Sequence, residues 1–163
     1  MDVIGEGAAH VCFVRANAGH NTTRDLDVCN DALADDLSKR DRAATFINRG
    51  VVRLALNQFD EAEADFGRGI AVEPELGEGY LNRGAAYIAM KRFADAMTDI
   101  DKGLGLGVSR PAVGYYDRAI ANEALGNNRA AYDDYQKVLA LEPDFLRARE
   151  QLKRFHIVQK PDS

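Results

Sequence analysis

The feature that most constrains this chain is a segment of about 34 residues that occurs three times in succession. Residues 47–74 read INRGVVRLALNQFDEAEADFGRGIAVEP, and residues 81–108 read LNRGAAYIAMKRFADAMTDIDKGLGLGV, 34 positions later. The third copy, residues 116–143, follows after 35 positions, and the additional residue falls in the Gly-rich stretch 103–111. A fixed period of this length is typical of a solenoid, in which each copy stacks on its neighbours.

Each copy is predicted to fold into two antiparallel helices joined by a short turn. Small residues that let two helices approach closely recur at equivalent positions: Gly50, Gly84 and Ala119 in the first helix, and Ala62, Ala96 and Ala131 in the second. The expected turns are Asn57-Gln58, Lys91-Arg92 and Gly126-Asn127. Two copies end at Pro74 and Pro143, because proline lacks the N–H that a continuing helix needs.

These positions resemble the tetratricopeptide repeat, a family with a period of about 34 residues and small, aromatic and proline positions in this order. The resemblance covers roughly residues 43–143. It departs from the family at Val108, where proline is usual, and at Gly69, Gly103 and Val138, where alanine is commoner. The resemblance implies an all-α fold, a right-handed α-solenoid of antiparallel helix pairs.

The predicted organisation is a series of helix pairs closed at both ends by atypical units. It comprises a degenerate N-terminal helix pair at 1–42 (helices near 8–16 and 25–36), repeats at 43–76, 77–111 and 112–145, and a C-terminal capping helix with a tail at 146–163. Terminal units of a solenoid differ from the others because one of their faces meets solvent. Residues 158–163 are expected to fray.

Composition excludes several classes of function. The chain has 21 basic and 26 acidic residues, a net charge of −5, and its basic residues are scattered among acidic ones, which argues against a nucleic-acid partner. No apolar run approaches the roughly 18 residues of a membrane-spanning helix, so membrane insertion is not expected. His10, His20 and His156 are far apart, and no nucleophile, phosphate-binding or metal-binding motif occurs. We therefore predict a non-catalytic protein without a cofactor or a metal.

The two cysteines, Cys12 and Cys29, fall one on each helix of the N-terminal pair. They are either a structural disulfide or two buried free thiols, and one cysteine on each antiparallel helix favours the disulfide. Such a bond would contribute roughly 3 kcal/mol to stability. It favours a periplasmic or secreted location, with a cytoplasmic one as the alternative, since the first ten residues, MDVIGEGAAH, do not resemble a signal peptide.

A charged pattern also repeats. Arg49, Arg83 and Arg118 are each followed 16 positions later by an aspartate, Asp65, Asp99 and Asp134 respectively. We expect an ion pair between the two helices of each repeat, which would satisfy both groups and fix the register; the alternative is that the arginines form an anion-binding site.

The residue before each arginine points to function. These residues are Asn48, Asn82 and Asp117, and in the family that the chain resembles the first helices line a concave surface. The resemblance thus implies a row of polar side chains suited to the backbone of an extended peptide; the alternative is ordinary solvated helix surface. Apolar residues expected to line the same groove are Ile47, Val51, Leu81, Tyr116 and Ile120.

The predicted function is a protein–protein interaction scaffold that binds a peptide or helix segment of a partner in this groove. Family members that bind chaperone tails place Lys and Arg in the groove, and such residues are missing here. The alternative is a structural module that self-associates into a homo-oligomer through its apolar surface.

Overall fold

The computed structural model describes residues 7–19 and 21–155, and in these ranges the chain is all-α. The described part contains nine helices: α1 (Ala8–Ala16), α2 (Thr23–Ala34), α3 (Lys39–Ala55), α4 (Phe59–Val72), α5 (Gly77–Ala89), α6 (Phe93–Leu106), α7 (Pro111–Ala124), α8 (Asn128–Leu141) and α9 (Leu146–Leu152). The predicted fold class is confirmed. The expectations for the first residues of the chain and for a fraying tail at 158–163 lie outside the described residues.

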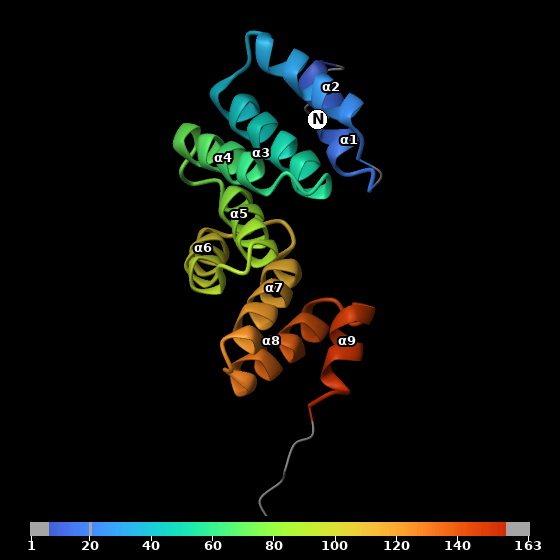
Figure 1. The fold of residues 1–163 in the computed structure, drawn as a ribbon, viewed down its shortest axis with the longest axis vertical. Helices are drawn as coiled ribbons and strands as arrows, with labels where there is room; N and C mark the ends of the chain where they lie inside the picture. Colours follow the sequence, from blue (N-terminus) through green and yellow to red (C-terminus); the bar gives the residue numbers. More distant parts are fainter. Residues whose placement is uncertain (1–6, 20, 156–163) are drawn as a thin grey trace, which may run out of the picture.

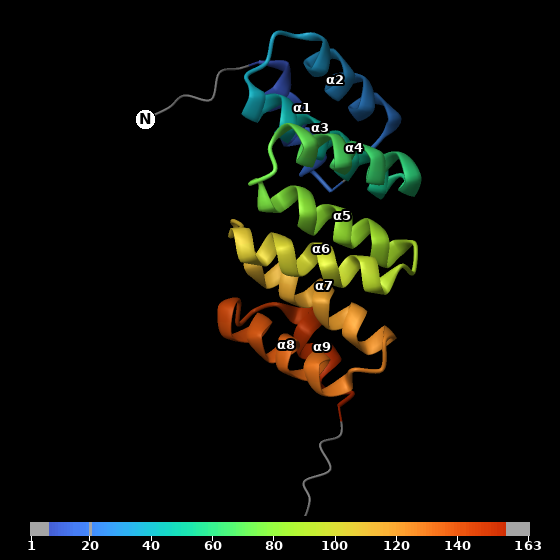
Figure 2. The same cartoon turned by 90° about the vertical axis from the view of Figure 1, so that its left-hand side faces the viewer.

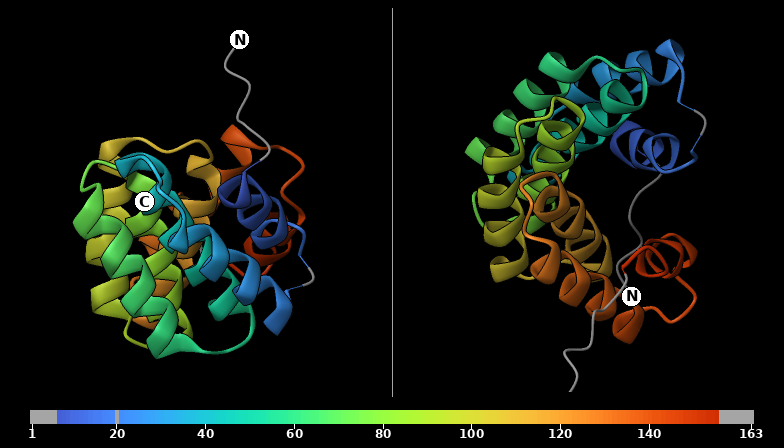
Figure 3. Two further views of the ribbon diagram at one scale, coloured as in Figure 1. Left: turned by 90° about the horizontal axis from the view of Figure 1, so that it is seen from above. Right: turned by 60° about the horizontal axis from the view of Figure 1, so that its bottom comes forward.

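The helices pack in consecutive pairs that stack along the long axis of the molecule (Figures 1 and 2). The three strongest pairings are α3 with α4, α5 with α6, and α7 with α8, and each pair also packs on the next. The first helices contact one another, α3 with α5 and α5 with α7. The stack curves so that α1 and α9 face each other on one side, while α4 and α6 lie on the other (Figure 3).

Small residues set the distance between the helices of each pair. A Cβ atom added to Gly50 would lie 2.5 Å from Cε1 of Phe66, and one added to Gly84 would lie 2.7 Å from Cγ1 of Ile100. Both distances are shorter than carbon atoms tolerate. The predicted close approach at these positions is confirmed, and Ala119, the equivalent residue in the third pair, is fully buried.

The predicted turns lie between the paired helices and share one backbone feature. Asn57, Lys91 and Gly126 all adopt a positive φ, at 60°, 59° and 80°. The left-handed region suits glycine and disfavours residues that carry a Cβ atom. Repetition of this conformation shows that the three turns have the same geometry even though their sequences differ.

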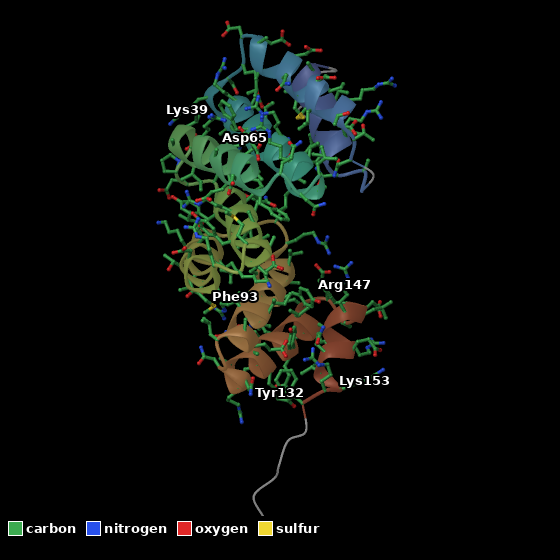
Figure 4. The ribbon with its side chains drawn as sticks, viewed as in Figure 1. Lys39, Asp65, Phe93, Tyr132, Arg147 and Lys153 are labelled. Atoms are coloured by element: carbon green, nitrogen blue, oxygen red, sulfur yellow. A yellow bond between two sulfur atoms is a disulfide. The ribbon has the colours of Figure 1, made fainter. Side chains whose placement is uncertain are left out.

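The predicted ion pair is present in every repeat. Arg49 donates from Nε and Nη2 to the two carboxylate oxygens of Asp65, both at 2.7 Å. The same two-point contact joins Arg83 to Asp99 at 2.6 and 2.9 Å, and Arg118 to Asp134 at 2.9 and 2.7 Å. Asp65 is fully buried between α3 and α4 (Figure 4).

The two ends of the stack differ in their cores. At the N-terminal end Cys12 and Cys29 form a disulfide between α1 and α2, within a core of small side chains that α3 completes with Val52. At the C-terminal end α9 is only seven residues long, and its Ala148 is buried in a core that contains Tyr135 of α8, with Tyr115 and Tyr116 of α7 packed against it. Among the described helices, none combines the length and the low charge that crossing a membrane requires.

Candidate functional site

The candidate site is the inner surface of the stack, formed by one stripe of side chains on each first helix. Ala44 and Asn48 of α3 line a cavity beside α1, so this stripe of α3 faces the side on which α1 lies. Equivalent positions continue it along α5 and α7. From this equivalence we assign ten residues to the surface, called the concave surface below: Ala44, Asn48, Val51, Asn82, Ala85, Ile88, Val113, Tyr116, Asp117 and Ile120, all of them half-buried.

The three polar residues of this surface differ in their hydrogen bonding. Asn82 donates from Nδ2 to the backbone oxygen of Glu78 at 2.8 Å, so half of its amide is occupied by its own helix. In the part of the chain that the structure describes, the side chain of Asn48 has no hydrogen-bond partner, and neither does that of Asp117. The predicted row of polar groups is therefore uneven, with free groups at its two ends.

The surroundings of Asp117 shift the pKa of its carboxyl group. Desolvation by the surrounding helices raises the pKa of its carboxyl group to about 7. Near neutral pH the group is divided between its charged and its neutral forms. It can then either accept or donate a hydrogen bond, as a peptide amide does.

Two of the apolar residues predicted for the groove are core residues instead. Ile47 is 5% exposed and Leu81 is 8% exposed. Ile47 lies against Gly69 and Gly79, and Leu81 lies against Gly103 and Gly114, where the missing side chains leave room for them. The prediction that Ile47 and Leu81 line an open groove is therefore wrong, because glycines on neighbouring helices let both side chains sink between the repeats.

The other three predicted apolar residues, Val51, Tyr116 and Ile120, remain partly exposed. Tyr116 closes the C-terminal end of the surface. Its ring centroid lies 5.1 Å from that of Phe145 and 5.7 Å from that of Tyr135, and aromatic pairs at such distances are stabilising. This end of the concave surface is consequently rigid and apolar.

The charge of the concave surface is one-sided. Its only carboxyl group is that of Asp117, and the stripe on α5 begins with Glu78, whose carboxylate accepts a hydrogen bond from the backbone of Ser109. Neither lysine nor arginine belongs to it. The surface is thus apolar with acidic character.

A cavity of about 420 Å³ lies at the N-terminal end of this surface, between α1, α3 and the loop that joins α2 to α3. Its lining includes Asn48, so the cavity opens onto the concave surface. The sequence gives no sign of this cavity, because Asp35 and Asp36 fall at the end of the helix predicted near 25–36. Within the described ranges, no three or more His, Cys, Asp or Glu side chains are grouped so that they could hold a metal ion.

Comparison with known proteins identifies the fold. Residues 112–145 match the model of the tetratricopeptide repeat family. None of the curated proteins compared with the chain matches it.

Solved structures are similar over most of the chain. The first TPR domain of Spaghetti (RPAP3), bound to the HSP90 peptide SRMEEVD, is 28% identical, with a TM-score of 0.65 over 69% of this chain and 88% of that one. The TPR domain of Arabidopsis OM64 is 23% identical, with a TM-score of 0.68 over 72% and 96%. YrrB, a TPR protein with an unusual peptide-binding site, is 19% identical, with a TM-score of 0.68 over 78% and 63%.

Proposed function

We propose that this protein, which has the fold of tetratricopeptide repeat domains and carries a repeat of that family at 112–145, is a non-catalytic scaffold. It binds a peptide or helix segment of a partner protein across the concave surface of α3, α5 and α7. Relatives with this fold bind peptides: that of RPAP3 holds an HSP90 peptide, and YrrB has a peptide-binding site.

The observation that carries the proposal is the pairing of free polar groups with partly exposed apolar side chains on one surface. Asn48 offers a complete amide, and Asp117 offers a carboxyl that donates or accepts near neutral pH. Val51, Tyr116 and Ile120 supply apolar contacts next to them. A backbone needs both donors and acceptors, and apolar side chains need pockets between them.

The ligand class differs from that of RPAP3. The peptide SRMEEVD bound there is acidic towards its C-terminus, whereas the surface here has no basic side chain and bears Asp117. Like charges brought together on binding lower affinity. The partner segment is therefore apolar and neutral or basic.

The disulfide supports a location in an oxidising compartment, such as the periplasm or the cell exterior, since such bonds are rare in reducing compartments. In such a compartment the disulfide between α1 and α2 would already be formed when the partner binds.

The test is capture of the partner from native extract by the wild-type protein and by the double variant Asn48→Ala/Asn82→Ala. The variant should lose the partner while its circular dichroism spectrum stays unchanged. Asn128→Ala, on the exposed start of α8, is the matched control and should keep it. Retention by the double variant would move binding away from the concave surface.

A second candidate function, self-association, is favoured by one observation. Helix α1 exposes Phe13 at 51% and Val14 at 49%, and neighbouring exposed apolar side chains often mark an interface. Light scattering decides between the two candidates: a dimer that Phe13→Ser converts into a monomer would favour self-association.

A further inference from the structure

The cavity at the N-terminal end of the concave surface has an apolar interior. Three elements line it, and the apolar contributions are Ala8, Ala9, Phe13, Leu37 and Ala44. Its volume of about 420 Å³ falls in the range of about 300–1,000 Å³ that is usual for ligand pockets. It is large enough for one aromatic or branched aliphatic side chain together with part of its neighbour.

Three carboxylates surround this interior: Asp35, Asp36 and Asp41. Asp41 accepts a hydrogen bond from the hydroxyl of Ser38 at 2.7 Å. Asp35 and Asp36 are exposed, and neither forms an ion pair within the described part of the chain. The rim of the cavity, formed by these carboxylates, therefore places the unpaired negative charges of Asp35 and Asp36 next to the apolar interior.

Within the described part of the chain, the nearby cations Arg42 and Lys39 form no ion pair with these carboxylates. Arg42 points its guanidinium at the backbone oxygens of Leu33 and Asp35, at 3.3 Å each, and not at a carboxylate. Lys39 lies 3.8 Å from Glu73 at the end of α4. The carboxylates of the rim therefore remain available to a cation from outside.

We propose that this cavity is the anchor site for the partner segment, and that it selects an apolar side chain directly followed by lysine or arginine. The apolar side chain fills the interior against Phe13 and Ala44, and the cation lies between Asp35 and Asp36. Asn48 lines the cavity and also begins the concave surface, so the rest of the segment continues from it towards Asn82. This inference rests on the proposed function and adds the chemistry of the ligand.

The site also depends on the disulfide. One wall is the nine-residue helix α1, which carries Ala8, Ala9, His10 and Phe13 of the lining. Cys12, on the same helix, is joined to Cys29 of α2. Helices this short are marginal without tertiary support, so the bond, together with the packing of α1 on α3, holds this wall in place.

The test uses fluorescence anisotropy with the oxidised full-length protein and three short labelled peptides of equal length. Their central residues are Phe-Lys-Arg, Phe-Glu-Asp and Gly-Lys-Arg. The first should bind at least roughly ten-fold more tightly than the other two, because only it supplies both the apolar group and the cations. Raising the salt concentration should weaken its binding, since the rim is exposed to solvent.

Amino-acid substitutions test whether the Phe-Lys-Arg peptide binds at the cavity. Asp35→Asn/Asp36→Asn should weaken the Phe-Lys-Arg peptide roughly ten-fold without loss of stability, because both side chains are exposed. Ala44→Leu should abolish binding by filling the interior, and Cys12→Ser/Cys29→Ser should weaken it by releasing α1. Asp133→Asn, an exposed aspartate on α8, is the matched control and should bind as the wild type does.

Equal affinity for all three peptides, or no effect of Asp35→Asn/Asp36→Asn, would overturn the anchor site. So would a dimer whose interface covers Phe13, because a second copy would then be the occupant. The proposed function has a separate test, which is whether capture of the native partner requires Asn48 and Asn82. A partner lost with those two residues but indifferent to Asp35 and Asp36 would leave the scaffold in place and remove the anchor.

Discussion

The first helix pair and the three repeats that follow it are held together by different bonds. In the first pair a disulfide joins α1 to α2, and the shared core consists of small side chains such as Ala16 and Ala32. In the repeats a two-point arginine–aspartate contact joins the helices, and the core contains the fully buried side chains of Phe66, Ile100 and Tyr135.

The difference follows from how much apolar surface each pair can bury. A large buried side chain contributes about 1.5–3 kcal/mol, which alanines cannot match. A disulfide contributes a similar amount by restricting the unfolded chain, about 3 kcal/mol for a loop of this length. The covalent bond thus occurs where the apolar core is thinnest.

Removing the central carboxylate of a repeat should have the largest effect. Asp65 accepts hydrogen bonds from Arg49, Arg53 and Arg68, and Asp65→Asn would leave these partly buried cations without their counter-charge. We expect a loss of about 3–5 kcal/mol in the free energy of unfolding, measured by urea denaturation. Asp60→Asn, on the exposed start of the same helix, should change it by less than about 0.5 kcal/mol. A comparable small change for Asp65→Asn would mean that the apolar core alone holds the repeat.

Removing the disulfide should have a smaller effect that stays local. Cys12→Ser/Cys29→Ser should destabilise the first pair by about 3 kcal/mol. Hydrogen exchange should become faster in α1 and α2 and remain slow in α5 to α8, because each pair of a solenoid contacts only its neighbours. Faster exchange along the whole chain would show that the first pair supports the entire stack.

The two regions should respond to pH in opposite directions. Burial raises the pKa of Asp117 to about 7, above its unfolded value, so the third repeat loses stability as the pH rises from about 4 to 7. Hydrogen bonds from Thr22 lower the pKa of Asp25 in the first pair. That pair keeps the contribution above the unfolded pKa and loses it as the pH falls through the folded value.

The variant Asp117→Asn isolates the first of these effects. It should stabilise the protein at pH 8 by about 2 kcal/mol, because each unit of raised pKa corresponds to about 1.4 kcal/mol and partial exposure screens the effect. The gain should vanish at about pH 3, below the ordinary pKa of 3.8, where this carboxyl is mostly protonated in the folded and in the unfolded protein. Thermal unfolding at the two pH values measures it, and an equal gain at both would assign it to packing instead of charge.

The smallest expected effect concerns a turn. Lys91 has a positive φ of 59°, and the equivalent residue of the third repeat is Gly126. Lys91→Gly should therefore stabilise the protein by about 0.5–1 kcal/mol. Lys102→Gly, in the exposed middle of α6, should instead destabilise it by about 1 kcal/mol. If both changes were destabilising, the side chain of Lys91 would contribute more than the strain of its backbone costs.

The helix pairs and their ion pairs could be predicted because both are local and repeated. Arg49 and Asp65 are 16 positions apart, and the recurrence of this spacing at Arg83 and Arg118 favoured an ion pair over an anion-binding site. A contact within one repeat can be predicted from the sequence of that repeat, without knowing how the neighbouring repeats pack. The pattern alone therefore placed these side chains correctly.

The errors and omissions concern contacts between different units. Whether Ile47 is open or buried depends on Gly79 of α5, in the next repeat, as well as on Gly69 of its own repeat. The cavity depends on how α1 packs against α3, and no repeat relates this contact to the others. Non-repeating contacts of this kind leave no period in the sequence from which they could be predicted.

The location of each ion pair has a consequence for how such a chain can lengthen. Arg49, Arg53, Arg68 and Asp65 all belong to one helix pair, so a duplicated stretch of 34 residues would carry every charge that it needs to hold its own two helices. The N-terminal pair has no such ion pair and is joined by its disulfide instead. A duplicated repeat would therefore bring its own inter-helix bond with it in any compartment, whereas a duplicated N-terminal pair would need oxidising conditions to form its bond.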